Sequence, residues 1–148
     1  MNSDFRDLLQ ILEKFNVRYL IAGGYAVIHH SQPRYTKDLD VWIEPSKENA
    51  RSLMRAFADF GIPLIGVTEC DFATPGTQFS IGVQPSELDF LTTIPGLSFS
   101  EAWENREESD QEGHPVLYLG RDDLITAKRT AGRHQDLADI EEIERANN

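Results

Sequence analysis

The sequence is poor in the features that mark secreted and membrane proteins. It has one cysteine in 148 residues, so an intramolecular disulfide is excluded and a reducing compartment is expected. The N-terminus has neither the basic start nor the apolar run of a signal peptide. No apolar stretch approaches the roughly 20 residues that cross a bilayer. We therefore expect a cytoplasmic protein without a membrane partner.

Basic residues are also scarce. There are 14 Lys and Arg against 25 Asp and Glu, a formal net charge of −11. Such a charge repels phosphate backbones at long range and argues against a free-standing nucleic-acid-binding surface. Acidic runs at 101–112 and 136–144 are interpreted as solvated faces. A local basic patch remains open, with Arg34, Lys37, Lys128, Arg129 and Arg133 as its candidate members.

Length and hydrophobic periodicity predict a small α/β protein. The chain fits a single domain, 1–148. Its apolar spacing predicts an α/β (α+β) fold with a small mixed β-sheet flanked by helices. The expected strands are 17–22, 38–43, 79–83, 88–90 and 116–119, the third and fourth joined at Gln84-Pro85-Ser86. The expected helices are 3–15 (capped by Ser3 or Asp4), 25–30, 47–60 (capped by Ser46), a short one within 96–103, 121–131 and 134–146, whereas 62–77 stay unassigned.

Two aspartates on one predicted strand are the first candidates for chemistry. Side chains two positions apart on a strand share a face, so Asp38 and Asp40 lie together, with Cα atoms about 6.5–7 Å apart. Such carboxylates repel each other and are desolvated by the sheet. A hard cation such as Mg²⁺ (or Mn²⁺) removes this penalty. Alone, the Asp-x-Asp pattern is also typical of two solvated acids on an edge strand.

A third carboxylate on a neighbouring strand would complete a two-metal clamp with ions about 3.5–4 Å apart. Asp89 is the natural candidate, because Leu88 and Phe90 on either side of it are expected in the core. Glu87 shares the face of Asp89, and periodicity alone does not choose between the two acids.

Two glycines, Gly23 and Gly24, stand where a predicted strand meets a predicted helix. Glycine tolerates positive φ and close approach, so free N–H groups at this helix start would cradle a phosphate. A simple tight turn is the other interpretation of an isolated Gly-Gly pair. Strand, Gly-Gly, helix, Asp-x-Asp and a later lone Asp form a far more specific combination than any one of them.

These segments resemble the polymerase-β-like nucleotidyltransferase superfamily, in particular its small bacterial branch related to abortive-infection and toxin–antitoxin nucleotidyltransferases. The resemblance covers about residues 18–143 and includes a C-terminal helical motif specific to the branch. It implies a nucleotidyltransferase-like fold and the attack of an acceptor hydroxyl on the α-phosphate of a nucleoside triphosphate. The segments that carry it are 22–26, 34–40, 88–92, 96–103 and 123–128, with Arg133, Asp136 and Asp139 beyond.

The resemblance also implies roles for individual residues. Asp38 and Asp40 would bind both metals, and Asp89 would bind the metal on the nucleophile side and help deprotonate the acceptor. Gly23 and Gly24 would hold the triphosphate, and Lys128 and Arg133 would neutralise its outer phosphates, although Lys128 also fits a solvated helix lysine paired with Asp123 or Asp136. Independently of the resemblance, Arg34 and Thr36 precede the aspartates and would orient phosphate or hydrogen-bond the Asp38 carboxylate.

The chain departs from the common superfamily pattern in two ways. Gly-Gly replaces the more frequent Gly-Ser, which removes a serine hydroxyl from the triphosphate site. No appended domain holds a large acceptor, so the acceptor stays unidentified (an RNA end, a protein or a small molecule) and a cognate protein partner is plausible. The alternative function is a catalytically quiet module of a two-gene, toxin–antitoxin-like system that binds a nucleotide or a partner.

Two adjacent histidines, His29 and His30, follow the glycines on the same predicted helix. Neighbouring helical residues diverge by about 100°, so the two side chains do not easily ligate one ion. They are therefore interpreted as surface or core histidines.

Overall fold

A six-stranded mixed sheet organises the molecule. The computed structural model describes residues 1–83 and 86–146, and its strands run in the order β3-β4-β2-β1-β6-β5. β2 pairs in parallel with β4, and β1 in parallel with β6. The other three pairs are antiparallel. The strands are β1 (Tyr19–Ala22), β2 (Asp38–Ile43), β3 (Gln78–Val83), β4 (Ser86–Leu91), β5 (Glu107–Gln111) and β6 (His114–Tyr118).

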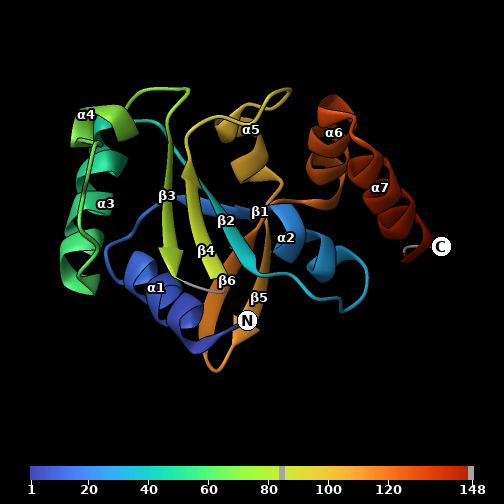
Figure 1. Ribbon diagram of the computed structural model, residues 1–148, viewed down its shortest axis with the longest axis horizontal. Coiled ribbons are helices and arrows are strands. Elements are labelled where there is room, and N and C mark those ends of the chain that lie inside the picture. Colours follow the sequence, from blue (N-terminus) through green and yellow to red (C-terminus); the bar gives the residue numbers. More distant parts are fainter. Residues whose placement is uncertain (84–85, 147–148) are drawn as a thin grey trace.

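Helices flank this sheet. Figure 1 shows α3 and α4 at one end of the view and α6 and α7 at the opposite end, with the sheet between them. This mixed sheet with flanking helices confirms the predicted fold class. None of the helices in the described ranges combines the length and apolar character needed to cross a membrane. The helices are α1 (Ser3–Lys14), α2 (Gly23–His30), α3 (Lys47–Phe60), α4 (Glu69–Phe72), α5 (Phe99–Glu104), α6 (Arg121–Ala131) and α7 (His134–Ala146).

The alternation of apolar and acidic residues along the central strands sets the two faces of the sheet. Leu39, Val41 and Phe90 are fully buried, and the ring of Phe90 lies 4.9 Å from that of Phe57 on α3. On the other face Trp42 packs edge-on against Phe99 of α5, with ring centroids 4.9 Å apart. The acidic positions of β2 and β4 therefore share a face with Trp42, away from the α3 side of the core.

The helix ends follow local capping rules, with one correction. The side chain of Ser46 caps α3 as expected, and Gly61 ends that helix at a φ of +88°. The cap of α1, however, is neither Ser3 nor Asp4. The side chain of Asn2 accepts the Phe5 N–H at 2.8 Å, so the helix begins one residue earlier than a Ser3 cap requires and two earlier than an Asp4 cap requires.

Two elements were not expected from the sequence. Thr68 and Asp71 form a reciprocal capping box that starts α4 within the unassigned stretch 62–77. The acidic run 101–112 contains β5, whose residues are mostly exposed at the end of the sheet. The expected hairpin of β3 and β4 is present, with Phe79 opposite Phe90, but its predicted connection at Gln84-Pro85 lies outside the described residues.

Candidate functional site

Four carboxylates from β2 and β4 meet on one face of the sheet. The parallel register sets Asp38 beside Glu87 and Asp40 beside Asp89. One oxygen each from Asp38, Glu87 and Asp89 lies within 4.8 Å of the others. Asp89 thus lies on the same side of the sheet as Asp38 and Asp40. Glu87, which alternation could not separate from Asp89, joins the same group.

The carboxylate of Asp40 has a strongly raised pKa. Burial, followed by the charge of Asp89, a hydrogen bond with Asp89 and the charge of Asp38, raises the pKa of Asp40 to about 7. Lys128 acts in the opposite direction and does not cancel these effects. At neutral pH the apo site therefore resists carrying its full negative charge.

The arrangement fits a hard divalent cation. The Oδ1 atom of Asp38 is buried and has no hydrogen-bond partner among the described residues, and a buried carboxylate oxygen without a partner is costly. Asp89 is held in place by the hydroxyl of Ser80, which donates to its Oδ1 at 2.6 Å. An all-oxygen donor set with crowded negative charge is what Mg²⁺ or Mn²⁺ prefers.

Gly23 and Gly24 begin α2 directly beside these acids. Gly23 has a φ of +62°, and a β carbon there would overlap Oδ2 of Asp40. A β carbon on Gly24 would approach Oγ1 of Thr36 to 2.6 Å. Ala22, which precedes the helix, supplies no side-chain cap, so the first backbone N–H groups of α2 keep their donor capacity. A β carbon at either glycine would collide with a neighbouring side chain, and the structure brings the helix start to Asp40.

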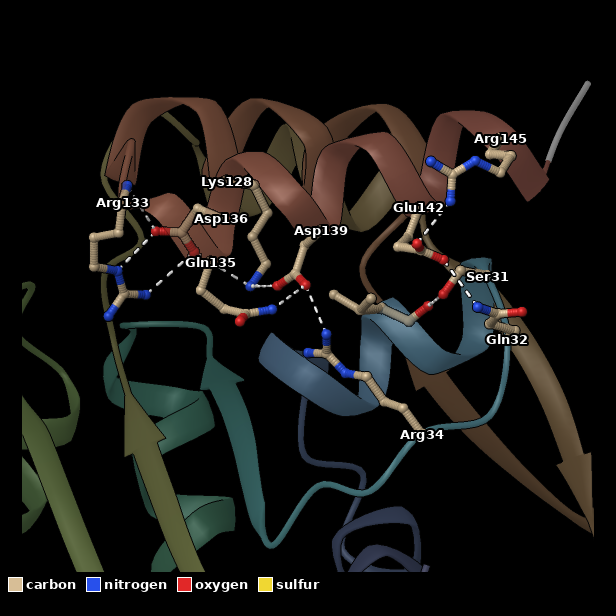
Figure 2. Close-up of polar contacts among 11 residues, drawn as sticks. Ser31, Gln32, Arg34, Lys128, Arg133, Gln135, Asp136, Asp139, Glu142 and Arg145 are labelled. Atoms are coloured by element: carbon tan, nitrogen blue, oxygen red, sulfur yellow. Dashed lines mark hydrogen bonds and ion pairs between the residues drawn. The ribbon is translucent and has the colours of Figure 1, made fainter.

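The cations predicted to face phosphate are held by two buried aspartates of α7. Lys128 lies 3.4 Å from Asp136 and 2.9 Å from Asp139. Arg133 contacts Asp136 at 2.7 Å, and Arg34 contacts Asp139 at 2.6 Å. Figure 2 shows these side chains converging from α6, the turn between α6 and α7, α7 itself and the loop that follows α2. Together they form a network, the α7 ion-pair cluster, defined by these five residues.

The α7 ion-pair cluster corrects three sequence-based interpretations. Asp136 and Asp139 are buried and are not part of a solvated acidic face. Lys128 pairs with both of them, and its side chain is only 13% exposed, so it is not a solvated lysine. Arg34 bonds Asp139 and not Asp38. The signal for burial was the spacing of Asp136 and Asp139, which places them on the same side of α7 as the buried Ile140 and Ile143.

The two buried aspartates are kept ionised by their partners. Hydrogen bonding from Arg133 lowers the pKa of Asp136 and outweighs its burial. Burial alone would raise the pKa of Asp139, but hydrogen bonds from Arg34, Lys128 and Gln135 together hold it below its usual value. The cluster is therefore a set of fixed charges at neutral pH.

A cavity of about 610 Å³ lies between the glycine turn and α6. Of the predicted residues it brings together Gly23, Asp40, Lys128 and Arg133. Arg34 and Thr36 instead line a second cavity, of about 330 Å³. The larger cavity is lined by the acidic side chain of Asp40 and by the cationic side chain of Arg133, which is 77% exposed. It has the dimensions of a small-molecule site.

The sequence matches one protein-family model over nearly its whole length. The family described as "Nucleotidyltransferase of unknown function (DUF6036)" matches residues 2–147. No functionally curated protein gives a significant match. Among solved structures, the lincosamide antibiotic adenylyltransferase LnuA is similar with a TM-score of 0.62 and 13% identity over 97% of this chain and 96% of that chain.

Two further structures share the fold. The antibiotic-resistance factor ANT(2'')-Ia superposes with a TM-score of 0.63 and 13% identity, covering 99% of this chain and 83% of that one. An antigenic nucleotidyltransferase-like protein from Paracoccidioides brasiliensis has a TM-score of 0.57 and 17% identity, with 93% and 72% coverage. At these identities the likeness concerns the fold, a mixed sheet with flanking helices.

Proposed function

The chain belongs to a nucleotidyltransferase family of unknown function, DUF6036, and from this membership we propose that it transfers a nucleoside monophosphate from a nucleoside triphosphate to an acceptor hydroxyl. The observation that carries the proposal is the pairing of Asp40 with Asp89 beside Gly23. It supports a site in which acids and a phosphate-binding turn act on the same substrate. In this proposal Asp38, Asp40 and Asp89 hold divalent cations, with Glu87 beside them.

Each group of site residues has a separate role in the proposed transfer. The acceptor oxygen forms a bond to the α-phosphorus, the bond from that phosphorus to the bridging oxygen breaks, and pyrophosphate leaves. Asp89 is positioned by Ser80 to take the acceptor proton. The N–H groups at Gly23 and Gly24 hold phosphate oxygens. When bound, the divalent cations supply positive charge against the oxygens of the transferred group.

Lys128 and Arg133 are proposed to meet the outer phosphates. Both line the same cavity as Gly23 and Asp40, and Arg133 is exposed enough to turn toward a ligand. Because Lys128 and Arg133 are each paired with an α7 aspartate, their charge is partly neutralised before a nucleotide arrives. Arg34 and Thr36 then act indirectly, Arg34 by fixing Asp139 and Thr36 by lying against Gly24.

A small hydroxyl-bearing molecule is the acceptor class that we propose. LnuA is a lincosamide antibiotic adenylyltransferase matched over nearly its whole length, and ANT(2'')-Ia is an antibiotic-resistance factor seen in complex with adenylyl-2''-tobramycin. The net charge of −11 disfavours an RNA end and favours an acceptor that is neutral or cationic. An RNA or protein acceptor is the other outcome of the experiment below.

The second candidate is a catalytically quiet module that binds a nucleotide or a protein partner. It is favoured by one observation: the cations available to the triphosphate are already engaged by Asp136 and Asp139. If these pairs persist, the triphosphate is bound weakly or only together with a partner. The two candidates differ in whether divalent metal and intact carboxylates are required.

The test is a label-transfer assay with α-labelled nucleoside triphosphates, Mg²⁺ or Mn²⁺, and separated small-molecule, RNA and protein fractions of a cell extract. Metal-dependent label in the small-molecule fraction is expected, and it should vanish in Asp40→Asn and Asp89→Asn. Asp122→Asn is the matched control, because the Asp122 side chain is 93% exposed. Metal-dependent transfer to RNA or protein would replace the acceptor class, and nucleotide binding without any transfer would favour the quiet module.

A further inference from the structure

The C-terminal end of α2 meets the outer strand of the sheet at a cluster of two histidines and a glutamate. Nε2 of His29 lies 3.6 Å from Oε1 of Glu107, and Nδ1 of His30 lies 3.5 Å from Oε2 of the same residue. One ligand atom from each of the three side chains lies within 4.8 Å of the others. We call these three residues the His–His–Glu cluster.

The two histidine side chains converge on Glu107 although neighbouring helical positions point about 100° apart. The rings meet edge to face with centroids 4.8 Å apart. His29 contacts Glu107 through Nε2, the ring nitrogen farther from its backbone, and His30 through Nδ1, the nearer one. This difference in distance from the backbone compensates for the rotation between neighbouring helical positions. His29 is further held by stacking on Tyr118, with centroids 4.2 Å apart and planes 7° from parallel.

The orientation of His30 is fixed by a backbone carbonyl. Its Nε2 lies 2.8 Å from the oxygen of Leu119. Because a carbonyl oxygen only accepts, Nε2 must carry the proton, and in neutral imidazole Nδ1 then presents a lone pair. This lone pair faces a carboxylate oxygen of Glu107. Either a proton or a metal ion between the two atoms is needed to make the contact favourable.

Both histidine–glutamate separations are longer than an ordinary hydrogen bond. N–H···O bonds are usually about 2.7–3.2 Å long, shorter than the 3.5 and 3.6 Å separations here. A tetrahedral zinc ion with ligand bonds of about 2.0–2.1 Å has ligand–ligand edges of about 3.3–3.4 Å. The two separations end on different oxygens of Glu107, and one ligand atom from each of the three side chains lies within 4.8 Å of the others, so the three atoms would contract toward a bound ion.

We propose that His29, His30 and Glu107 form a site for a divalent transition-metal ion of the zinc type, with water as the fourth ligand. Two imidazole nitrogens and one carboxylate oxygen are a common zinc donor set. The carbonyl bond that fixes His30 is the kind of support that metal-bound histidines have. The donor set differs from the all-oxygen carboxylate group of β2 and β4, which selects harder cations.

Such an ion would tie α2 to the sheet. Glu107 begins β5, and His29 and His30 end the helix that starts at Gly23. Bound metal would thus connect the outer strand to the element that carries the glycine turn. The expected consequence is a more stable protein when the metal is present, because the ion binds the folded arrangement.

The experiment measures Zn²⁺ bound to tag-free protein by equilibrium dialysis and metal analysis, in excess Mg²⁺ to occupy the carboxylate site. Co²⁺ gives a second readout through the visible absorption of its four-coordinate complexes. We expect one ion per chain and a rise in Tm with Zn²⁺. His29→Gln and Glu107→Gln, which change the two more exposed ligands, should each weaken binding by more than about 10-fold while the protein stays folded by circular dichroism.

Matched controls separate this site from others. His114→Gln removes a histidine that is paired with a single glutamate, its Nδ1 lying 3.4 Å from Glu13. Cys70→Ser removes the exposed thiol. Both should bind Zn²⁺ like the unchanged protein, as should Asp40→Asn, which tests independence from nucleotidyl transfer. No binding to the unchanged protein, binding that survives both ligand changes, or binding lost in His114→Gln or Cys70→Ser would overturn the proposal.

Discussion

The carboxylate of Asp40 fills the space in which a side chain on Gly23 would lie. The acid lies on β2 and the glycine at the start of α2. The carboxylate leaves no room for a side chain on the glycine, and the missing side chain leaves room for the carboxylate. The positive φ of Gly23, +62°, turns its backbone so that the helix start can approach the carboxylate. The contact therefore joins the two motifs that carry the proposed chemistry.

Gly23→Ala is expected to disturb both motifs together. The added methyl group would collide with Oδ2 of Asp40, and overpacking of this kind costs on the order of 1–3 kcal/mol. Urea denaturation should show that loss, and nucleotidyl transfer should fall with it. Gly82→Ala is the control, because a β carbon at Gly82 meets no atom within 4 Å. Equal stability of the two variants would contradict the close contact.

Ser80→Ala tests the positioning of Asp89. The hydroxyl of Ser80 donates to Asp89 Oδ1 at 2.6 Å, and removing such a supporting hydrogen bond typically costs about 10–100-fold in activity or metal affinity. We expect Ser80→Ala to lower kcat/KM within that range, with a higher Mg²⁺ requirement, and Asp89→Asn to lower it further. An unchanged Mg²⁺ dependence in Ser80→Ala would show that the hydroxyl does not support the acid.

The stability of the metal-free protein should fall as pH rises toward neutrality because of Asp40. The folded pKa, about 7, lies above the ordinary value of 3.8, so between these values the folded state binds more protons than the unfolded state. The stabilisation that proton binding to Asp40 gives the folded state is complete below about pH 4 and lost above about pH 7. In EDTA, the free energy of unfolding of Asp40→Asn minus that of the unchanged protein should increase by on the order of 2–3 kcal/mol when the pH is raised from 5 to 8.

Two comparisons check this interpretation of Asp40. Asp122→Asn, on an exposed side chain, should show no such pH-dependent gain. Excess Mg²⁺ should restore the stability of the unchanged protein at pH 8, because the cation offsets the charge of the acids. A gain of Asp40→Asn that is equal at both pH values would rule out titration of this group as its origin.

Asp139→Asn should strongly destabilise the protein at neutral pH. Asp139 is buried with Arg34 at 2.6 Å and Lys128 at 2.9 Å, and breaking a buried ion pair costs about 3–5 kcal/mol. Because the folded pKa of Asp139 is lowered, its contribution is present above the unfolded value of 3.8 and disappears as pH falls through the folded pKa. Urea titrations near pH 7 and below about pH 4 would measure both effects.

The control for this prediction lies one turn further along α7. Glu142 forms an ion pair with Arg145 at 2.7 Å, and the Arg145 side chain is 68% exposed. Solvent-exposed pairs contribute about 0–1 kcal/mol, so Glu142→Gln should change little. If Glu142→Gln and Asp139→Asn lose similar stability, burial is not what makes the α7 ion-pair cluster important.

The sequence predicted the central part of the sheet well, because alternation there has a physical cause. Leu39 and Leu88 are buried where Asp38 and Asp89 are not, and only the two-residue period of a half-buried strand yields this pattern. Alternation could not give the register. The neighbour relation of Asp38 with Glu87 depends on which strands pair in parallel, a choice made by the whole chain.

Prediction from the sequence was less accurate where charge and burial conflict. Asp136 and Asp139 were interpreted as solvated because acids rarely enter a core unpaired, and their cationic partners come from three different segments. The partnership of His29 and His30 with Glu107 is equally remote, since it joins α2 to β5 across the sheet edge. Such contacts arise from tertiary structure and have no local periodicity.

The position of β5 has a consequence for how copies of the protein behave in solution. In the described part of the chain this strand has a neighbour on one side only, and it carries exposed Glu108 and Asp110. A free strand is a template for intermolecular pairing, and like charges along it oppose that pairing. Near the isoelectric point of about 4.7 the net charge vanishes and the long-range repulsion between copies is lost, so mild acid should promote association through β5 before it unfolds the protein.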